Sequence, residues 1–176
     1  IVRFRGNIGT ALMYGFEGFA DWNLKETFLP SLTKMKLNYF LNLALTASEY
    51  ISSEENNVEG NQVEFIPKVN LKTGLRFGYG NLLGSLQYSY LSNQFTDATN
   101  APQDVNDNQR GIEGAIPAYD ILDASFSYTL KKWRLEAGVN NVLNNTYFTR
   151  RATGYPGPGI LPAEPRTAYV TLQLTL

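Results

Sequence analysis

The most constraining feature of this sequence is an alternation of apolar and polar residues with a period of two. It is clearest in residues 69–80. One set of positions holds Val69, Leu71, Thr73, Leu75, Phe77 and Tyr79, and the other holds Asn70, Lys72, Gly74, Arg76, Gly78 and Gly80. Successive side chains of a β-strand point to opposite faces, whereas a helix repeats about every 3.6 residues. The pattern therefore predicts a strand with one apolar face.

The same alternation recurs in about seven segments and predicts an all-β protein. Residues 37–48 place leucines on one face, with Phe40 as an aromatic exception on the other. The remaining predicted strands cover residues 10–22, 82–92, 119–130, 133–143 and 167–176. No apolar run reaches the roughly 18 residues that a membrane-spanning helix needs.

The connections between these segments alternate between short and long. The short ones are Gly80-Asn81 and Lys131-Lys132, and the long ones cover residues 51–68, 95–117 and 151–165, while residues 25–32 form a turn that is longer than expected. Tight periplasmic turns and large extracellular loops are typical of outer-membrane barrels. We therefore predict an antiparallel transmembrane β-barrel whose long loops face outward.

The predicted polar face distinguishes a membrane barrel from a soluble one. It consists mostly of Asn, Gly, Ser and Thr, with isolated charges that we expect to face the lumen: Glu17, Lys72, Arg76, Asp123 and Glu136. Aromatic residues such as Trp22, Tyr128 and Trp133 lie toward the segment ends, where they would meet the membrane interfaces. Both features favour a barrel with an outward apolar face.

Composition excludes several classes of function. The net charge of -1 provides no basic surplus for nucleic acid, so we expect no nucleic-acid partner. Cysteine and histidine are absent, which removes thiolate and imidazole chemistry. We predict no catalytic residue, no metal site and no cofactor, and hence a protein that is not an enzyme.

Four motifs resemble those of TonB-dependent receptors, in the same order along the chain. They are Tyr-Gly-Phe-Glu-Gly at 14–18, Ile-Pro-Lys-Val-Asn at 66–70, Trp-Arg-Leu-Glu-Ala-Gly-Val-Asn-Asn-Val-Leu-Asn-Asn-Thr-Tyr at 133–147 and Pro-Arg-Thr-Ala-Tyr at 165–169. The resemblance implies that residues 1–176 are the C-terminal part of such a barrel. They would supply about the last seven of its 22 strands, with the plug domain absent. The chain ends in Leu176, whereas members usually end in an aromatic residue.

Residues 147–159 look most like the last outer loop of the iron(III) dicitrate transport receptors. This resemblance implies import of a ferric chelate across the bacterial outer membrane, with energy from TonB supplied through the missing N-terminal plug region. The implied ligand-binding residues are Arg150, Arg151 and Tyr155, because guanidinium groups bind carboxylates through paired hydrogen bonds. The alternative is that both arginines bond lipopolysaccharide or neighbouring loops at the membrane rim.

Two other architectures remain open from the sequence. One is a complete eight-stranded outer-membrane barrel with a structural or adhesion role. The other is a soluble β-sandwich binding module. The sandwich would bury the alternating leucines in its own core: Leu41, Leu43, Leu71, Leu75, Leu172 and Leu174.

Overall fold

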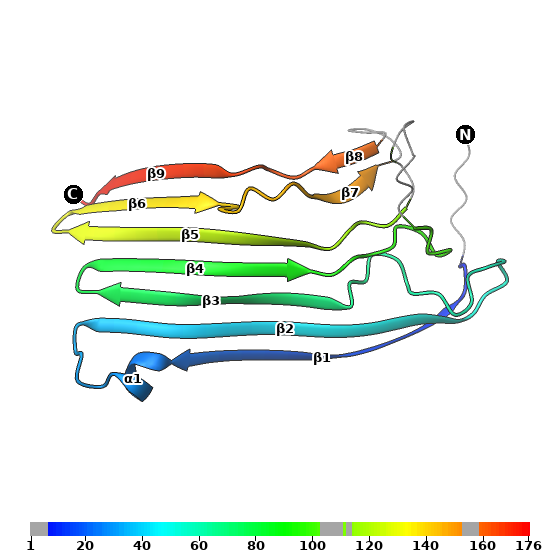
Figure 1. Cartoon of the computed structure of the whole chain (residues 1–176), viewed down its shortest axis with the longest axis horizontal. Helices are drawn as coiled ribbons and strands as arrows, with labels where there is room; N and C mark the ends of the chain where they lie inside the picture. The colour runs from blue at the N-terminus through cyan, green and yellow to red at the C-terminus, as the bar shows by residue number, and fades with distance from the viewer. Residues whose placement is uncertain (1–6, 103–110, 112–113, 153–158) are drawn as a thin grey trace.

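The structure is a computed structural model that describes residues 7–102, 111, 114–152 and 159–176 (Figure 1). Its main element is an antiparallel seven-stranded sheet in the order β1-β2-β3-β4-β5-β6-β9. The strands are β1 (Thr10–Asn23), β2 (Met35–Ser52), β3 (Val69–Tyr79), β4 (Leu82–Leu91), β5 (Tyr119–Leu130), β6 (Trp133–Asn140) and β9 (Thr167–Leu174). The all-β prediction is confirmed, and all seven predicted segments form strands of this sheet.

Strand register gives the sheet two distinct faces, because directly paired residues project to the same side. One row across the sheet is Trp22, Tyr39, Leu75, Leu86, Ala124, Val139 and Ala168. The neighbouring row is Asn23, Asn38, Arg76, Ser85, Ser125, Gly138 and Tyr169. We call the side of the first row the apolar face and the side of the second the polar face.

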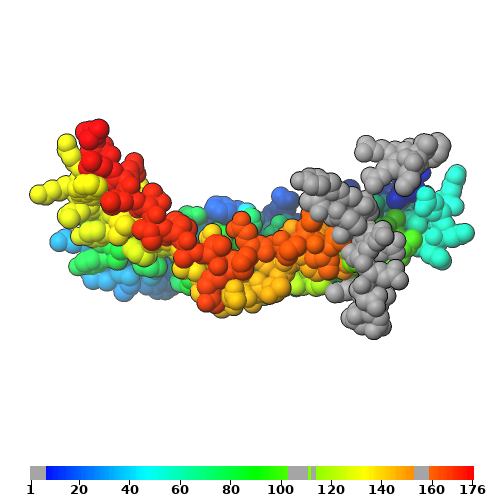
Figure 2. Space-filling model, turned by 90° about the horizontal axis from the view of Figure 1, so that it is seen from above, coloured from blue at the N-terminus to red at the C-terminus, as the bar shows by residue number. Residues whose placement is uncertain are grey.

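The sheet is a single layer, which Figure 2 shows as a thin slab seen from its β9 side. Within the described residues β1 and β9 each have one neighbour, as expected for an arc of a barrel. The six leucines that a soluble sandwich would bury are all at least partly exposed, and Leu172 is 63% exposed. The described part of the chain therefore contradicts the sandwich alternative.

The best-buried apolar residues lie among the long connections. Val58 and Ile116 are almost fully buried there, and Tyr50 is buried near the adjoining end of β2. The long connections lie at one end of the sheet, and the tight turns lie at the other end (Figure 1). This arrangement matches the predicted alternation of short and long connections.

The connection after β1 contains a short helix, α1 (Leu24–Phe28). The Asn23 side chain accepts a hydrogen bond from the Glu26 backbone N–H at 3.1 Å, which caps the helix start. Trp22 donates from Nε1 to the Thr27 hydroxyl at 2.8 Å. This helix explains why the turn is longer than a tight hairpin. Among the described residues, no helix is long and apolar enough to cross a membrane.

The predicted third long loop is wrong in part, because residues 151–165 are not wholly irregular. β7 (Phe148–Ala152) and β8 (Gly159–Pro162) pair into a separate two-stranded sheet. The predicted end of the sixth strand at residue 143 is also wrong, since β6 ends at Asn140. The next residue, Asn141, has φ of 51°, which takes the chain out of the extended conformation.

Candidate functional site

The five charged residues predicted to line a lumen all lie on the polar face. Strand pairing places Glu17 opposite Ala44, Lys72 opposite Asn42, Arg76 opposite Asn38, Asp123 opposite Gln87 and Glu136 opposite Ser127. The five residues come from four strands, β1, β3, β5 and β6, so their shared face follows from the strand register. That the polar face lines a lumen stays a prediction.

Arg76 makes both an ion pair and a cation–π contact on this face. Its Nη1 lies 3.0 Å from Asp21 Oδ2, and its guanidinium carbon lies 4.6 Å from the Phe40 ring centroid. Asn38 donates a hydrogen bond to the other Asp21 oxygen at 3.0 Å. The pair is partly exposed, so it contributes about 1 kcal/mol or less to stability and chiefly fixes the position of the guanidinium.

Phe40 departs from the alternation because it replaces a polar residue on the polar face. It is 7% exposed and is paired with Gly74, where a Cβ atom would approach the Phe40 ring to 2.8 Å. Glycine thus provides the space that the ring occupies. The aromatic exception in the sequence is explained by this close packing.

A shallow depression of about 530 Å³ lies over the strands of the polar face toward the tight turns. Its polar lining includes Lys36, Asn38, Arg76, Ser85, Ser125, Ser127, Arg134 and Glu136. Arg134 and Glu136 form an ion pair with a separation of 2.5 Å. Hydroxyl and guanidinium groups of this kind can bond a hydrophilic solute. Hydrocarbon, by contrast, would leave them unsatisfied.

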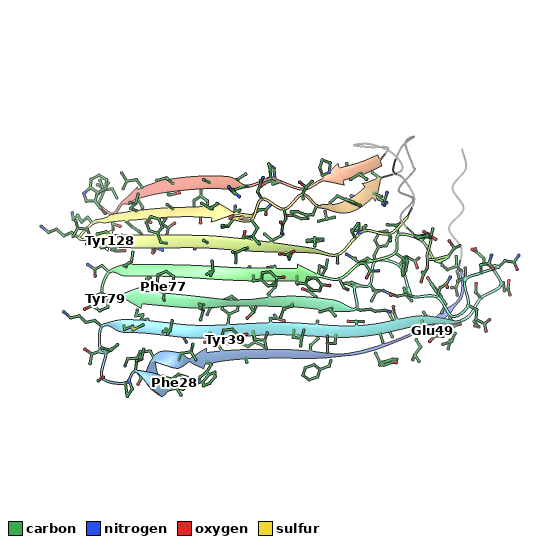
Figure 3. The ribbon with its side chains drawn as sticks, in the orientation of Figure 1. Phe28, Tyr39, Glu49, Phe77, Tyr79 and Tyr128 are labelled. Atoms are coloured by element: carbon green, nitrogen blue, oxygen red, sulfur yellow. The ribbon has the colours of Figure 1, made fainter. Side chains whose placement is uncertain are left out.

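The apolar face has aromatic residues near its tight-turn end. Tyr79 and Tyr128 lie at that end in Figure 3, and Trp133 occupies the adjoining register position on the same face. Glu49 lies at the opposite end of β2, where it pairs with Leu12 on the apolar side. An aromatic border followed by an apolar band, with charge beyond it, is the pattern of a lipid-facing barrel wall.

The segment after β6 is held by a network centred on Asn141, which is 3% exposed. Its backbone N–H donates to Asp123 at 2.9 Å, and its side-chain amide donates to the Asn145 carbonyl at 2.9 Å. The Asn145 backbone N–H donates a hydrogen bond to Asn141 Oδ1 at 3.0 Å. Asn144 accepts from the backbone of Arg166 at 3.1 Å. The Asn-rich motif thus ends β6 and joins the turn to the start of β9.

Tyr147 completes this turn by stacking on Tyr119 with a centroid separation of 4.6 Å. Burial raises the pKa of Tyr147, and the carboxylates of Asp123 and Glu164 raise it further. Both causes disfavour a charged phenolate. Tyr147 therefore remains a neutral packing residue well above neutral pH.

The long connections bond to one another and form what we call the loop cluster: the described residues of 53–68 and 92–116 together with β7 and β8. The Gln62 backbone N–H donates a hydrogen bond to Asn100 Oδ1 at 2.8 Å, and Asn100 Nδ2 donates to the Gln62 carbonyl at 2.7 Å. Asn61 donates to the Ala98 carbonyl at 2.9 Å. Residues nearly forty positions apart are thereby fixed side by side.

The two predicted ligand-binding arginines are neighbours on β7 but differ in environment. Arg150 is exposed. Arg151 is half-buried and donates from Nη1 to the Gly111 carbonyl and from Nη2 to the Ala115 carbonyl, each at 2.9 Å. The third predicted residue, Tyr155, lies outside the described residues.

Several residues of these networks were not predicted from the sequence. Asn141, Asn100 and Gln62 were among them, although the paired Asn residues at 140–141 and 144–145 were a usable signal for a side-chain-bonded turn. Within the described ranges, no three His, Cys, Asp or Glu residues are grouped so that they could hold a metal ion.

Comparison with known proteins identifies the fold. The family model described as TonB dependent receptor-like, beta-barrel matches residues 3–142. The chain belongs to this family of TonB-dependent receptors. A comparison with curated protein sequences gave no match.

Three solved structures of transporters and uptake receptors give the same fold. The unliganded ferric citrate transporter FecA aligns over 93% of this chain with 26% identity and a TM-score of 0.79. The ferric yersiniabactin uptake receptor FyuA from Yersinia pestis aligns over 96% with 20% identity and a TM-score of 0.71. The copper transporter OprC aligns over 93% with 14% identity and a TM-score of 0.63.

These alignments cover 24%, 24% and 23% of the respective solved chains, so this chain spans about a quarter of the length of such receptors. The TonB-dependent receptor family consists of transport receptors and not enzymes. The resemblance inferred from the four sequence motifs is therefore confirmed at the level of the family.

Proposed function

We propose that this chain forms part of the wall and outer loops of an outer-membrane receptor that binds a ferric chelate and imports it with energy from TonB. The observation that carries the proposal is the family match combined with a sheet whose two faces differ in chemistry. The apolar face would meet lipid and the polar face would line the transport route. The alignment with the ferric citrate transporter FecA, at 26% identity, supports an iron chelate as the ligand.

The orientation follows from the connections. The tight turns would face the periplasm, and the loop cluster would face outward, where it also meets lipopolysaccharide. The plug and the contact with TonB would lie in parts of the receptor outside these 176 residues. The receptor would then act in the outer membrane of a Gram-negative bacterium.

We propose that Arg150 provides the positive charge that binds the ligand. It is exposed on β7 within the loop cluster, and a guanidinium there can donate paired hydrogen bonds to a carboxylate of an anionic chelate. Tyr155 stays proposed as a second contact. Arg151 belongs to the same strand but has its Nη donors directed at backbone carbonyls.

The test is ligand binding by the intact receptor. Purified receptor would be titrated with ferric citrate, a ferric hydroxamate and a ferric catecholate, and uptake of labelled iron would be measured in cells with and without TonB. We expect one chelate to bind and its uptake to require TonB. Failure of all three chelates to bind, or uptake independent of TonB, would contradict the proposal.

The Arg150→Gln variant tests the proposed contact. Loss of a charged hydrogen bond of about 1.5–3 kcal/mol should lower affinity for an anionic chelate by about tenfold or more. Arg166→Gln is the matched control, since Arg166 is also exposed and lies outside the loop cluster. Equal affinities of the two variants would exclude Arg150 as a ligand contact.

A further inference from the structure

The side chain of Arg151 lies where β7 meets another long connection. Its two terminal nitrogens donate to the carbonyls of Gly111 and Ala115, and its guanidinium carbon lies 5.0 Å from the Phe148 ring centroid. Two parallel donors on a rigid planar group are a property of arginine, whereas lysine presents a single ammonium on a flexible stem. The contact therefore uses the shape of the guanidinium as well as its charge.

The segment that receives Arg151 is fixed by other bonds as well. Gln94 and Ile116 exchange backbone hydrogen bonds of 3.0 and 2.8 Å, and Thr96 donates its hydroxyl to the Gly114 carbonyl at 2.8 Å. Ile116 is 1% exposed. Residues 114–116 are thus bonded to 94–96 at Gln94 and Thr96, and to β7 through Arg151.

Gly111 packs against β8. Its φ is +60°, and a Cβ atom there would lie 3.1 Å from Ile160 Cγ1. A side chain at this position would be strained and crowded. The close approach places the Gly111 carbonyl within reach of Arg151.

The bonds continue to the first long connection. Residues 97–100 follow Thr96 directly, and Asn100 and Ala98 bond to Gln62 and Asn61. Hydrogen bonds therefore run from β7 to Gly111 and residues 114–116, and from there through residues 94–100 to residues 61–62. The described parts of the three long connections form one hydrogen-bonded assembly, in which Arg151 makes the connection to β7.

We propose that Arg151 is a positioning residue that joins the three long connections into one ligand-capturing unit, while its exposed neighbour Arg150 supplies the charge that meets the ligand. The proposal deepens the proposed function and rests on it for the identity of the ligand. The joint itself is a statement about the loops and can be tested with no ligand present.

The experiment compares Arg151→Lys, Arg150→Lys and Arg150→Gln in the intact receptor. Amide hydrogen exchange would be followed in residues 57–66, 94–102 and 114–116, with β2 to β5 as the internal measure of folding. Affinity for the chelate found to bind the parent receptor would be measured in parallel. The Arg151→Lys substitution keeps the positive charge but removes the paired hydrogen bonds to the two carbonyls. It therefore separates the positioning role of the guanidinium from the effect of its charge.

We expect Arg151→Lys to raise exchange in residues 94–102 and 114–116 about tenfold or more, with β2 to β5 unchanged. Residues 57–66 should respond more weakly, and affinity should fall severalfold although the charge remains. Arg150→Lys should leave exchange within about twofold of the parent and lower affinity less than Arg150→Gln does, because the charge remains while the paired hydrogen bonds to a carboxylate are lost. Arg150→Gln should lower affinity and leave exchange unchanged.

Parent-like exchange in Arg151→Lys would overturn the proposal whatever the affinity. Raised exchange with parent affinity would also overturn it, because the joint would then position nothing that the ligand contacts. If the parent receptor binds no ferric chelate, the proposed function fails, and the exchange measurement still decides whether Arg151 joins the loops. The two failures are therefore distinguishable.

Discussion

Asn141 shows how a single buried polar residue can end a strand. Its positive φ stops the extended conformation, and asparagine tolerates this region better than most residues. Its side chain then bonds both the turn and the segment before β9. Each of these partners would be left unsatisfied in a partly buried site if the amide were removed.

Asn141→Ala should lower the free energy of unfolding by about 2–4 kcal/mol, since three side-chain hydrogen bonds are lost and a non-glycine residue without a polar group must adopt positive φ. Urea unfolding of the intact receptor in detergent measures this change. Asn140→Ala is the control, because Asn140 is exposed and its side chain makes one bond of 3.5 Å to Thr167. Equal destabilisation by the two variants would contradict the role given to Asn141.

Tyr147 predicts a dependence of stability on alkaline pH. Its folded-state pKa is raised above 10.0, so the unfolded state loses the phenolic proton first as pH increases. The contribution is full below the unfolded pKa and is lost as pH rises through the folded pKa. Tyr147→Phe should therefore show a flatter decline of stability above about pH 10. Identical slopes for parent and variant would exclude this contribution.

At the scale of strands, three aromatic rings lie over glycines directly opposite them. The pairs are Phe40 with Gly74, Phe77 with Gly84 and Tyr169 with Gly138. The Phe77–Gly84 pair lies on the apolar face and the Tyr169–Gly138 pair lies on the polar face, so this packing occurs on both faces of the sheet. Because such a ring fits only over a glycine, the pair favours the native strand register over a register shifted along the strand.

Gly74→Ala tests one of these pairs. The added Cβ would meet the Leu86 carbonyl oxygen and the Phe40 ring, and backbone cannot move aside as a flexible side chain can. We expect a loss of about 1–3 kcal/mol in the free energy of unfolding, measured in urea as above. Ser85→Ala, a small substitution on the same face of β4, should change stability by less than about 0.5 kcal/mol.

The sequence predicted the seven long strands because the period-two pattern is local and each strand shares its apolar side with its neighbours. Helix α1 also left a local signal, since Asn23 precedes Glu26 at the capping interval. The pairing of β7 with β8 left no such signal. It depends on bonds between residues far apart in the chain, such as Arg151 with Gly111 and Ala115.

For the candidate site, sequence predicted which charged residues share a face but not which residues build the loop cluster. Alternation alone aligns Lys72 and Arg76, because they are four positions apart in one strand. The exchange of bonds between Gln62 and Asn100 depends on two connections meeting in space. Neighbouring Arg150 and Arg151 look equivalent in sequence, and only the structure separates the exposed from the half-buried guanidinium.

At the scale of the whole molecule, a seven-stranded layer with large exposed apolar side chains has no core of its own. Val170 at the β9 edge is 73% exposed. Such a surface is unfavourable in water and suitable for hydrocarbon. From the family match and the two-faced sheet we propose that the apolar face meets lipid.

Fluorescence quenching by lipid tests this central claim most directly. The 176 residues contain no cysteine, so Leu43→Cys and Asn42→Cys place unique labels in this region, on opposite faces of β2. Each variant of the intact receptor would carry a small fluorophore and be reconstituted into vesicles with brominated acyl chains. We predict strong quenching at position 43 and little at position 42. Equal quenching at both positions, or stronger quenching at 42, would contradict the account.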